Sequence, residues 1–318
     1  LPPFLGALTK AAGSLRERVA REIPAGRTRR QFWEHFFFGS MRDAFARGAG
    51  AFRDEVESLI SRSPKSTPGC VSLVGAGPGD AELLTLKAQR KLKEADVIVY
   101  DRLIGPDILE YARRDAVRIP VGKTSGKASP RQADINAILV REAQAGRHVV
   151  RLKGGDPYVF GRGGEEQRAL EAYGIAVDVV PGVTAALACA ASIGLPLTMR
   201  GRNQSITILT GASEDGLPEH DWRALAKPGQ TLAIYMGIGS AGHTQARLLN
   251  AGIDAATPVT IVENGTLAGE RVFETRIDAL AATVRSHAIS GPAIIYVGIS
   301  RLGQAQVVPF RPSLQAAS

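Results

Sequence analysis

The chain has 318 residues, 44% of them hydrophobic and 22% charged, with 35 glycines and a formal net charge of +8. This composition favours a soluble α/β protein long enough for two domains. Two widely separated cysteines and five scattered histidines match no metal-binding or redox spacing, so we expect no metal and a reducing, cytoplasmic location.

The basic surplus is concentrated near the N-terminus, where the first 62 residues hold 11 Lys/Arg against 7 Asp/Glu. Such a surplus suits nucleic acid, an anionic membrane or a polyanionic small molecule. Aromatic residues are few and show no base-stacking pattern, which argues against nucleic acid. The chain begins without a signal-peptide pattern, and proline and glycine interrupt its longest apolar run, 179–197, so we expect no membrane segment.

Residues 1–62 show no strand pattern and form the first predicted domain. Amphipathic helices are predicted over 8–23, 29–39 and 52–62. Five aromatic residues crowd 32–38, which indicates a small helical core, an apolar face for another subunit, or both. A linker rich in Ser, Pro and Gly follows at 63–69.

From residue 70 onward, apolar β-branched runs alternate with helical stretches, the pattern of a largely parallel sheet covered by helices. We predict two α/β domains, 70–195 and 204–318, because the chain turns irregular near 194–204. The second sheet is expected to be mixed, because 263–274 has the pattern of a hairpin.

Polar and glycine-rich groups follow one predicted strand after another, where ligands of open parallel sheets bind. Each group also has a purely structural interpretation: a tight turn with Asp80 capping the next helix, an ion pair for Asp101, a surface position for Lys123, a flexible loop at 161–166. Their shared location favours a binding site; they are Gly75–Asp80, Asp101, Lys123, Gly154–Asp156, Thr210–Gly211, Met236–Gly237 and Glu263–Gly265.

The first glycine-rich turn argues against a dinucleotide cofactor such as NAD. Its glycines, at 75, 77 and 79, follow G-x-G-x-G, and Asp80 stands where the dinucleotide fingerprint G-x-G-x-x-G places its last glycine. No constellation for hydride transfer accompanies it. An NAD-dependent oxidoreductase is therefore the weaker interpretation.

Nine segments through residues 70–300 carry a family resemblance: LVGAGPGDAELLTLKA, VYDRL, VGK, RLKGGDPYVFGRGGEE, VVPGVTAA, GLPLT, TG, YMG and ENGT. In this order and spacing they resemble the uroporphyrinogen-III C-methyltransferases of the tetrapyrrole methylase superfamily. The resemblance implies a two-domain class III methyltransferase fold with a cleft between the domains. It implies S-adenosylmethionine as cofactor, with S-adenosylhomocysteine as its product, and methylation of uroporphyrinogen III at C2 and C7 to precorrin-2 through precorrin-1.

Site residues follow from the same resemblance. Asp101 matches the family's proposed proton acceptor and Lys123 its proposed donor, while Arg162 and Glu165 match residues that bind or activate the macrocycle. Arginines suit the carboxylates of this substrate, which gives the basic surplus a use. The residues matching the cofactor site are Pro78, Gly154, Gly155, Asp156, Val159, Thr184, Ala185, Met236 and Gly265. Small residues there let backbone groups approach the cofactor closely.

Residues 1–62 resemble the helical dimerisation segment of the bifunctional siroheme synthases, so a homodimer is expected. By this resemblance the chain looks like a siroheme synthase without its NAD-binding dehydrogenase and ferrochelatase portion. We therefore expect neither NAD nor those activities here, and a separate dehydrogenase is a candidate partner. Three alternatives stay open: methylation of a later corrin precursor, methylation of RNA, and a role as an assembly partner of that dehydrogenase.

Overall fold

The computed structural model describes residues 4–24, 26–63, 68–122, 131–213 and 216–301. Within these residues the chain divides into two compact units. The first takes in residues up to Gly75 together with Leu86–Lys153 and Arg162–Pro181. The second takes in Ala76–Thr85, Gly154–Gly161 and the chain from Gly182 onward. The domain boundaries expected from the sequence, 70–195 and 204–318, stay a prediction.

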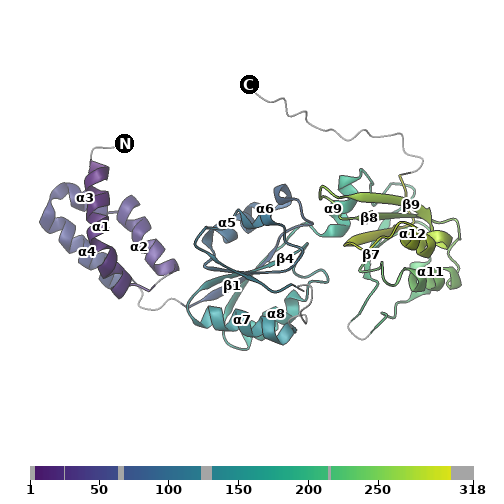
Figure 1. Ribbon diagram of the computed structural model, residues 1–318, viewed down its shortest axis with the longest axis horizontal. Helices are drawn as coiled ribbons and strands as arrows, with labels where there is room; N and C mark the ends of the chain where they lie inside the picture. The colour runs from purple at the N-terminus through teal and green to yellow at the C-terminus, as the bar shows by residue number, and fades with distance from the viewer. Residues whose placement is uncertain (1–3, 25, 64–67, 123–130, 214–215, 302–318) are drawn as a thin grey trace, which may run out of the picture. The chain divides into compact units, whose positions relative to one another are not determined.

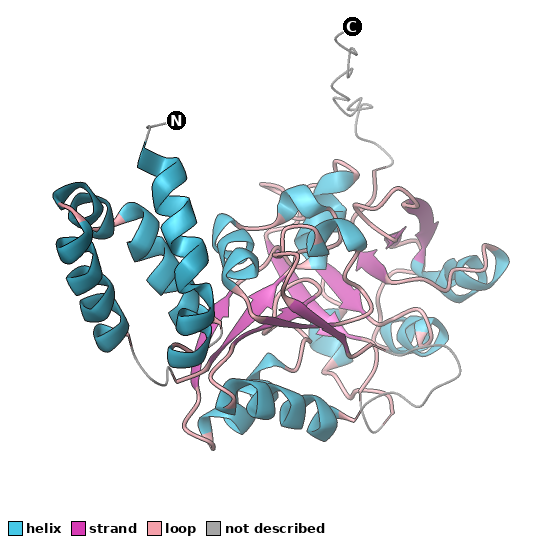
Figure 2. Ribbon diagram, turned by 60° about the vertical axis from the view of Figure 1, so that its left-hand side comes forward, coloured by secondary structure: helices cyan, strands magenta, loops and turns pink. Residues whose placement is uncertain are grey.

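The regular elements described within residues 1–62 are all helices, as predicted. Figure 2 shows these helices grouped together with no strand among them. Their apolar sides meet in a core that includes the rings of Phe32 and Phe36, both buried. Sequence analysis did not predict the short helix α3 (Met41–Arg47), which lies between Gly39 and Gly48. The four helices are α1 (Phe4–Glu22), α2 (Arg27–Phe38), α3 (Met41–Arg47) and α4 (Ala49–Arg62).

The first sheet is wholly parallel, with strand order β3-β2-β4-β1-β5. Its central strands are buried along nearly their whole length, because helices cover both faces. Figure 1 shows α5 and α6 on one side and α7 and α8 on the other. The strands are β1 (Cys70–Gly75), β2 (Val97–Tyr100), β3 (Val117–Pro120), β4 (His148–Lys153) and β5 (Ala176–Val180). The helices are α5 (Leu86–Glu94), α6 (Pro106–Leu109), α7 (Gln132–Gln144) and α8 (Gly163–Glu171).

The second sheet is mixed, as expected, with order β6-β7-β10-β8-β9. Only β6 and β7 run parallel, and β8 and β9 form the predicted hairpin. Its strands are β6 (Ser205–Thr210), β7 (Gln230–Tyr235), β8 (Pro258–Glu263), β9 (Arg271–Arg276) and β10 (Ala293–Val297). The alanine-rich helix α9 (Ala185–Ser192) packs on one face. The other face carries α10 (Trp222–Leu225), α11 (Ala241–Asn250) and α12 (Leu280–Ser286). Two short 3-10 helices complete the structure, η1 (Ala81–Leu83) and η2 (Ile277–Ala279).

Candidate functional site

All nine residues expected at the cofactor lie in the second unit, on loops and at the start of α9. The loop of Pro78 and the loop of Gly154–Asp156 are tied together by a two-residue bridge. Gly77 donates its N–H to the Gly155 carbonyl at 3.2 Å, and Gly155 donates back at 2.7 Å. Both glycines have positive φ, 75° and 67°, which only glycine adopts without strain. The glycine-rich turn is thus hydrogen-bonded to the loop of Gly154–Asp156.

The loop of Pro78 also contacts the loop of Gly265. Asp80 donates its N–H to the Thr266 hydroxyl at 3.3 Å. Gly79 has a φ of 148°, which favours glycine, and its backbone lies close to the Leu267 side chain, since an added Cβ would come within 2.6 Å of Leu267 Cδ2. The Asp80 carboxylate accepts from the Glu82 N–H at 2.8 Å, which caps η1. This is the capping role that the structural interpretation of the sequence predicted for Asp80.

Both carboxylate oxygens of Asp156 accept hydrogen bonds from backbone N–H groups. Oδ1 accepts from the Tyr158 N–H at 2.8 Å, and Oδ2 accepts from the Gly182 N–H at 3.1 Å. The Val159 N–H in turn donates to the Asp156 carbonyl at 3.3 Å. The side chain therefore holds the loop of residues 154–161 against the segment that leads into α9.

The start of α9 is fixed by a tyrosine from β7. The Tyr235 hydroxyl accepts the Ala186 N–H at 2.7 Å and shares a 2.6 Å hydrogen bond with the Thr184 hydroxyl. Burial raises the pKa of Tyr235, so this hydroxyl keeps its proton. A Cβ on Gly155 would lie 3.9 Å from the Ala185 nitrogen, which places the glycine loop beside this helix start. Sequence analysis did not identify Tyr235.

Met236 follows Tyr235 and is 52% exposed, with a φ of 52°. Asn264 and Thr266, on either side of Gly265, also have positive φ, as do Phe160 and Arg162. Such conformations cost energy in residues other than glycine and gather at functional sites. Gly265 itself packs against Cys189 of α9, whose sulfur would overlap any added Cβ. Strained backbone thus accompanies the residues expected at the cofactor.

Just before Gly265, the carboxylate of Glu263 is buried at the end of β8. It accepts from the N–H groups of Ser290 and Gly291, at 2.9 and 2.7 Å, and from Arg271 at 2.6 Å. Burial alone would raise the pKa of Glu263, but these donors together lower it below its usual range. Glu263 therefore anchors the end of the strand that carries the Gly265 loop.

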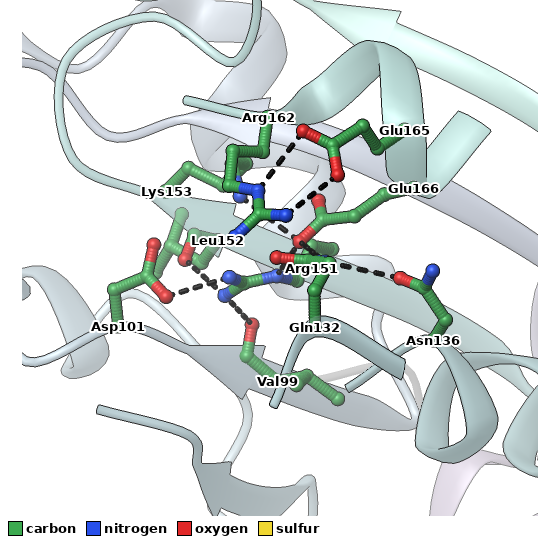
Figure 3. Close-up of polar contacts among 10 residues, drawn as sticks. All are labelled: Val99, Asp101, Gln132, Asn136, Arg151, Leu152, Lys153, Arg162, Glu165 and Glu166. Carbon is green, nitrogen blue, oxygen red and sulfur yellow. Dashed lines mark hydrogen bonds and ion pairs between the residues drawn. The ribbon is translucent and has the colours of Figure 1, made fainter. Parts of the chain in front are cut away.

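A second cluster lies in the first unit, around Asp101 (Figure 3). Asp101 follows β2 and accepts a 2.6 Å hydrogen bond from Arg151 of β4. Arg151 also donates Nε–H to Glu166 of α8 at 2.9 Å, and Lys153 of β4 donates to the same Glu166 oxygen at 3.0 Å. The ion pair expected for Asp101 in the structural interpretation is present, with a partner fifty positions along the chain.

Burial makes this cluster unusual. The side chains of Arg151, Lys153 and Glu166 are 2%, 4% and 0% exposed, while that of Asp101 is 30% exposed. Burial lowers the pKa of Lys153, and the neighbouring Arg151 guanidinium lowers it further. The sequence carried a signal that was missed, since Arg151 and Lys153 stand at alternate positions of the strand HVVRLK, next to valine and leucine.

Arg162 and Glu165 form a bidentate pair at the start of α8, with contacts of 2.9 and 2.8 Å. The Arg162 guanidinium holds the pKa of Glu165 below its usual range. Both side chains are about two-fifths exposed, at 42% and 43%. Lys123 lies outside the described residues. Among the residues that the structure describes, no group of three or more His, Cys, Asp or Glu side chains could hold a metal ion. The described helices also include none with the length and hydropathy of a membrane span.

Comparisons with known proteins agree with the resemblance seen in the sequence. A family model described as tetrapyrrole (corrin/porphyrin) methylases matches residues 71–281, and one described as the sirohaem synthase dimerisation region matches residues 5–51. Siroheme synthase 2 of Yersinia enterocolitica is 46% identical over 303 residues, which cover 94% of this chain and 63% of that protein. Siroheme synthase of Edwardsiella ictaluri is 45% identical over 99% of this chain and 66% of its own length. The chain thus spans just under two thirds of these relatives.

Two solved structures similar to this chain are methyltransferases as well. Uroporphyrin-III C-methyl transferase from Thermus thermophilus, complexed with S-adenyl homocysteine, is 42% identical with a TM-score of 0.63, covering 72% of this chain and 97% of that one. A cobalt precorrin-4 methyltransferase is 28% identical with a TM-score of 0.65, covering 72% of this chain and 94% of that one. These neighbours confirm the predicted α/β methylase fold.

Proposed function

This chain belongs to the tetrapyrrole (corrin/porphyrin) methylases, and on that basis we propose that it methylates uroporphyrinogen III. The methyl donor is S-adenosylmethionine, and two transfers, at C2 and C7, give precorrin-2 through precorrin-1. The observation that carries the proposal is the likeness to the uroporphyrin-III C-methyl transferase of Thermus thermophilus, which the chain covers almost completely.

The second unit's loops fit such a cofactor. A ligand at these loops would meet backbone groups rather than side chains. Three small residues cause this: Gly155 with its positive φ, Ala185 at the start of α9, and the tightly packed Gly265. The half-exposed Met236 thioether adds an apolar surface. S-adenosylmethionine supplies an electrophilic methyl group carried on a sulfonium sulfur. Because that group is already reactive, these residues act mainly by binding and orienting it.

Methylation of a pyrrole carbon requires that a proton leave the macrocycle, and we assign its acceptance to the Asp101 carboxylate. Arg151 contacts Oδ1, so Oδ2 is the oxygen that takes the proton. The role of Lys123 as proton donor stays part of the proposal.

Arg162 and Glu165 would meet the substrate's carboxylates. Their bidentate pair is partly exposed, so a substrate carboxylate can compete with Glu165 for the Arg162 fork. Arg162 is held in the left-handed region, with a φ of 57°. That strain supports a functional role for the position.

The test is an anaerobic incubation with uroporphyrinogen III and S-adenosylmethionine, read by mass spectrometry. A product heavier by two methyl groups, formed much more slowly by Asp101→Ala and at the wild-type rate by the exposed control Asp107→Ala, supports the proposal. Binding of S-adenosylhomocysteine without transfer would refute uroporphyrinogen III as the substrate. Later corrin precursors would then be tried, because the cobalt precorrin-4 methyltransferase shares the fold.

We further propose that the N-terminal helices form a homodimer. Residues 5–51 match the sirohaem synthase dimerisation region. Phe38 ends α2 with 89% of its surface exposed, although its neighbours Phe32 and Phe36 are buried in the helical core. An exposed aromatic side chain of this size suits an interface. Light scattering of the chain and of Phe38→Asp tests this, with a dimer expected for the first and a weakened dimer for the second. A separate dehydrogenase as partner is also a proposal.

A further inference from the structure

The central strand β4 carries two charged side chains where apolar ones are expected. Arg151 and Lys153 lie in a strand flanked by β2 and β1, and both are almost fully buried. Taking a charge out of water costs several kcal/mol, and an ion pair only partly offsets that cost. Stability alone is therefore a weak explanation for these residues.

Arg151 is held rigidly by what surrounds it. Its Nε–H donates to Glu166, and its Nη1 donates to the backbone carbonyls of Val99 and Leu152 at 3.4 and 3.3 Å. These contacts fix the plane of the guanidinium from three directions (Figure 3). The remaining nitrogen, Nη2, points at Asp101 Oδ1, which lies 2.6 Å away.

Glu166 is the anchor of this arrangement. It is fully buried, and its Oε1 accepts from Arg151, from Lys153 and, at 3.2 Å, from Gln132 of α7. Its Oε2 is buried without a hydrogen-bond partner in the structure. Two positive and two negative side chains thus form a charge-balanced set, and Asp101 is the member that reaches solvent.

We propose that Arg151 is the positioning residue for Asp101 and that Glu166 holds Arg151 in place for it. The assignment rests on the proposed function, in which Asp101 accepts a proton. Arg151 touches only one carboxylate oxygen, so it fixes the orientation of the carboxylate and leaves the other oxygen to react. A displacement of about 1 Å in such a group lowers a rate roughly a hundredfold.

The experiment is a double-mutant cycle on methyl transfer to uroporphyrinogen III with the whole chain. The variants are Asp101→Ala, Arg151→Met and the two combined, with Arg118→Met on the neighbouring strand β3 as control. Arg151→Met lowers kcat about 10- to 100-fold, with little change in KM or in the dissociation constant of S-adenosylhomocysteine. In the Asp101→Ala background the same change has no further effect on kcat, because the group that Arg151 positions is gone.

Two more variants separate positioning from folding. Arg151→Met leaves an excess of buried negative charge and can fail to fold, whereas Arg151→Met combined with Glu166→Gln keeps the charges balanced. The double variant folds and shows the same loss of kcat. Arg151→Lys keeps the charge, but a single ammonium cannot replace the fork that joins Glu166 to Asp101, so kcat stays low.

The outcomes are distinct. Wild-type activity in Arg151→Met, or a loss that multiplies with that of Asp101→Ala, overturns the positioning role while leaving the proposed function intact. A wild-type chain that binds S-adenosylhomocysteine but transfers no methyl group overturns the proposed function, and this assignment with it.

Discussion

Gly265→Ala tests whether the strained loop after β8 is packed as tightly as the structure indicates. The added Cβ would overlap the sulfur of Cys189 on α9 and would lie 3.0 Å from Cys189 Cβ and 3.2 Å from Val262 Cγ1. Real Cβ atoms essentially never approach a non-bonded atom more closely than 3.0 Å, so the Cys189 side chain, the loop or the helix must move. Overpacking of this kind costs about 1–3 kcal/mol.

The measurement is chemical denaturation followed by circular dichroism, together with calorimetric titration of S-adenosylhomocysteine. The matched control is Gly269→Ala in the same loop, where the added Cβ has no atom within 4 Å. That control should be neutral or slightly stabilising, since alanine restricts the unfolded chain. Gly265→Ala should lower both the stability and the ligand affinity, because the displaced loop carries a residue assigned to the cofactor.

A rescue variant tests the proposed cause. Cys189→Ala removes the sulfur, so Gly265→Ala should cost less in that background than in the wild type, although the contact with the remaining Cβ persists. If Gly265→Ala unfolds at the same denaturant concentration as Gly269→Ala, the packing argument is refuted. An equal cost with and without Cys189 would refute the sulfur as its cause.

Three further predictions concern the second unit. Tyr235→Phe leaves the Ala186 N–H without its acceptor, so it should cost about 1–3 kcal/mol of stability and weaken S-adenosylhomocysteine binding. The control Tyr173→Phe, at an exposed position, should be neutral in the same thermal denaturation and calorimetric titration. Folding lowers the pKa of Glu263 below 4.5, so its ionised carboxylate stabilises the protein above that pH, and this contribution is lost as the pH falls through the lower folded pKa. The free energies of unfolding of wild type and Glu263→Gln, followed by acid denaturation, should therefore converge at low pH. Burial raises the pKa of the Cys189 thiol to about 12, so iodoacetamide at pH 8 should modify it only after unfolding, and mass spectrometry of the native protein showing alkylated Cys189 would contradict this.

Local sequence patterns predicted most of the elements. The alternation of β-branched runs and helices from residue 70 onward and the hairpin at 263–274 were predicted, and the structure has β8 and β9 at that hairpin. These features depend on side-chain periodicity and turn chemistry within a few residues. The short helix α3 was not predicted because its seven residues make too few turns for a helical period to show.

The residues expected at the cofactor came from a resemblance, and the structure adds contacts between their loops that no local pattern contains. Gly77 pairs with Gly155, and Tyr235 bonds to the start of α9 about fifty positions earlier. Asp156 was expected to meet a ligand, whereas its two oxygens are occupied by backbone N–H groups. Their roles in binding stay predictions.

The sequence by itself determined that strands and helices alternate, that strand ends carry glycines and charges, and that Asp101 stands at one of those ends. Only the tertiary structure decided which charge Asp101 meets. The strand order places β4 beside β2, so Arg151 reaches Asp101 from fifty residues away, and α8 brings Glu166 into hydrogen-bonding distance of Arg151. Strand order and burial depend on how distant segments pack, and a buried charge is tolerated only where that packing supplies its partner.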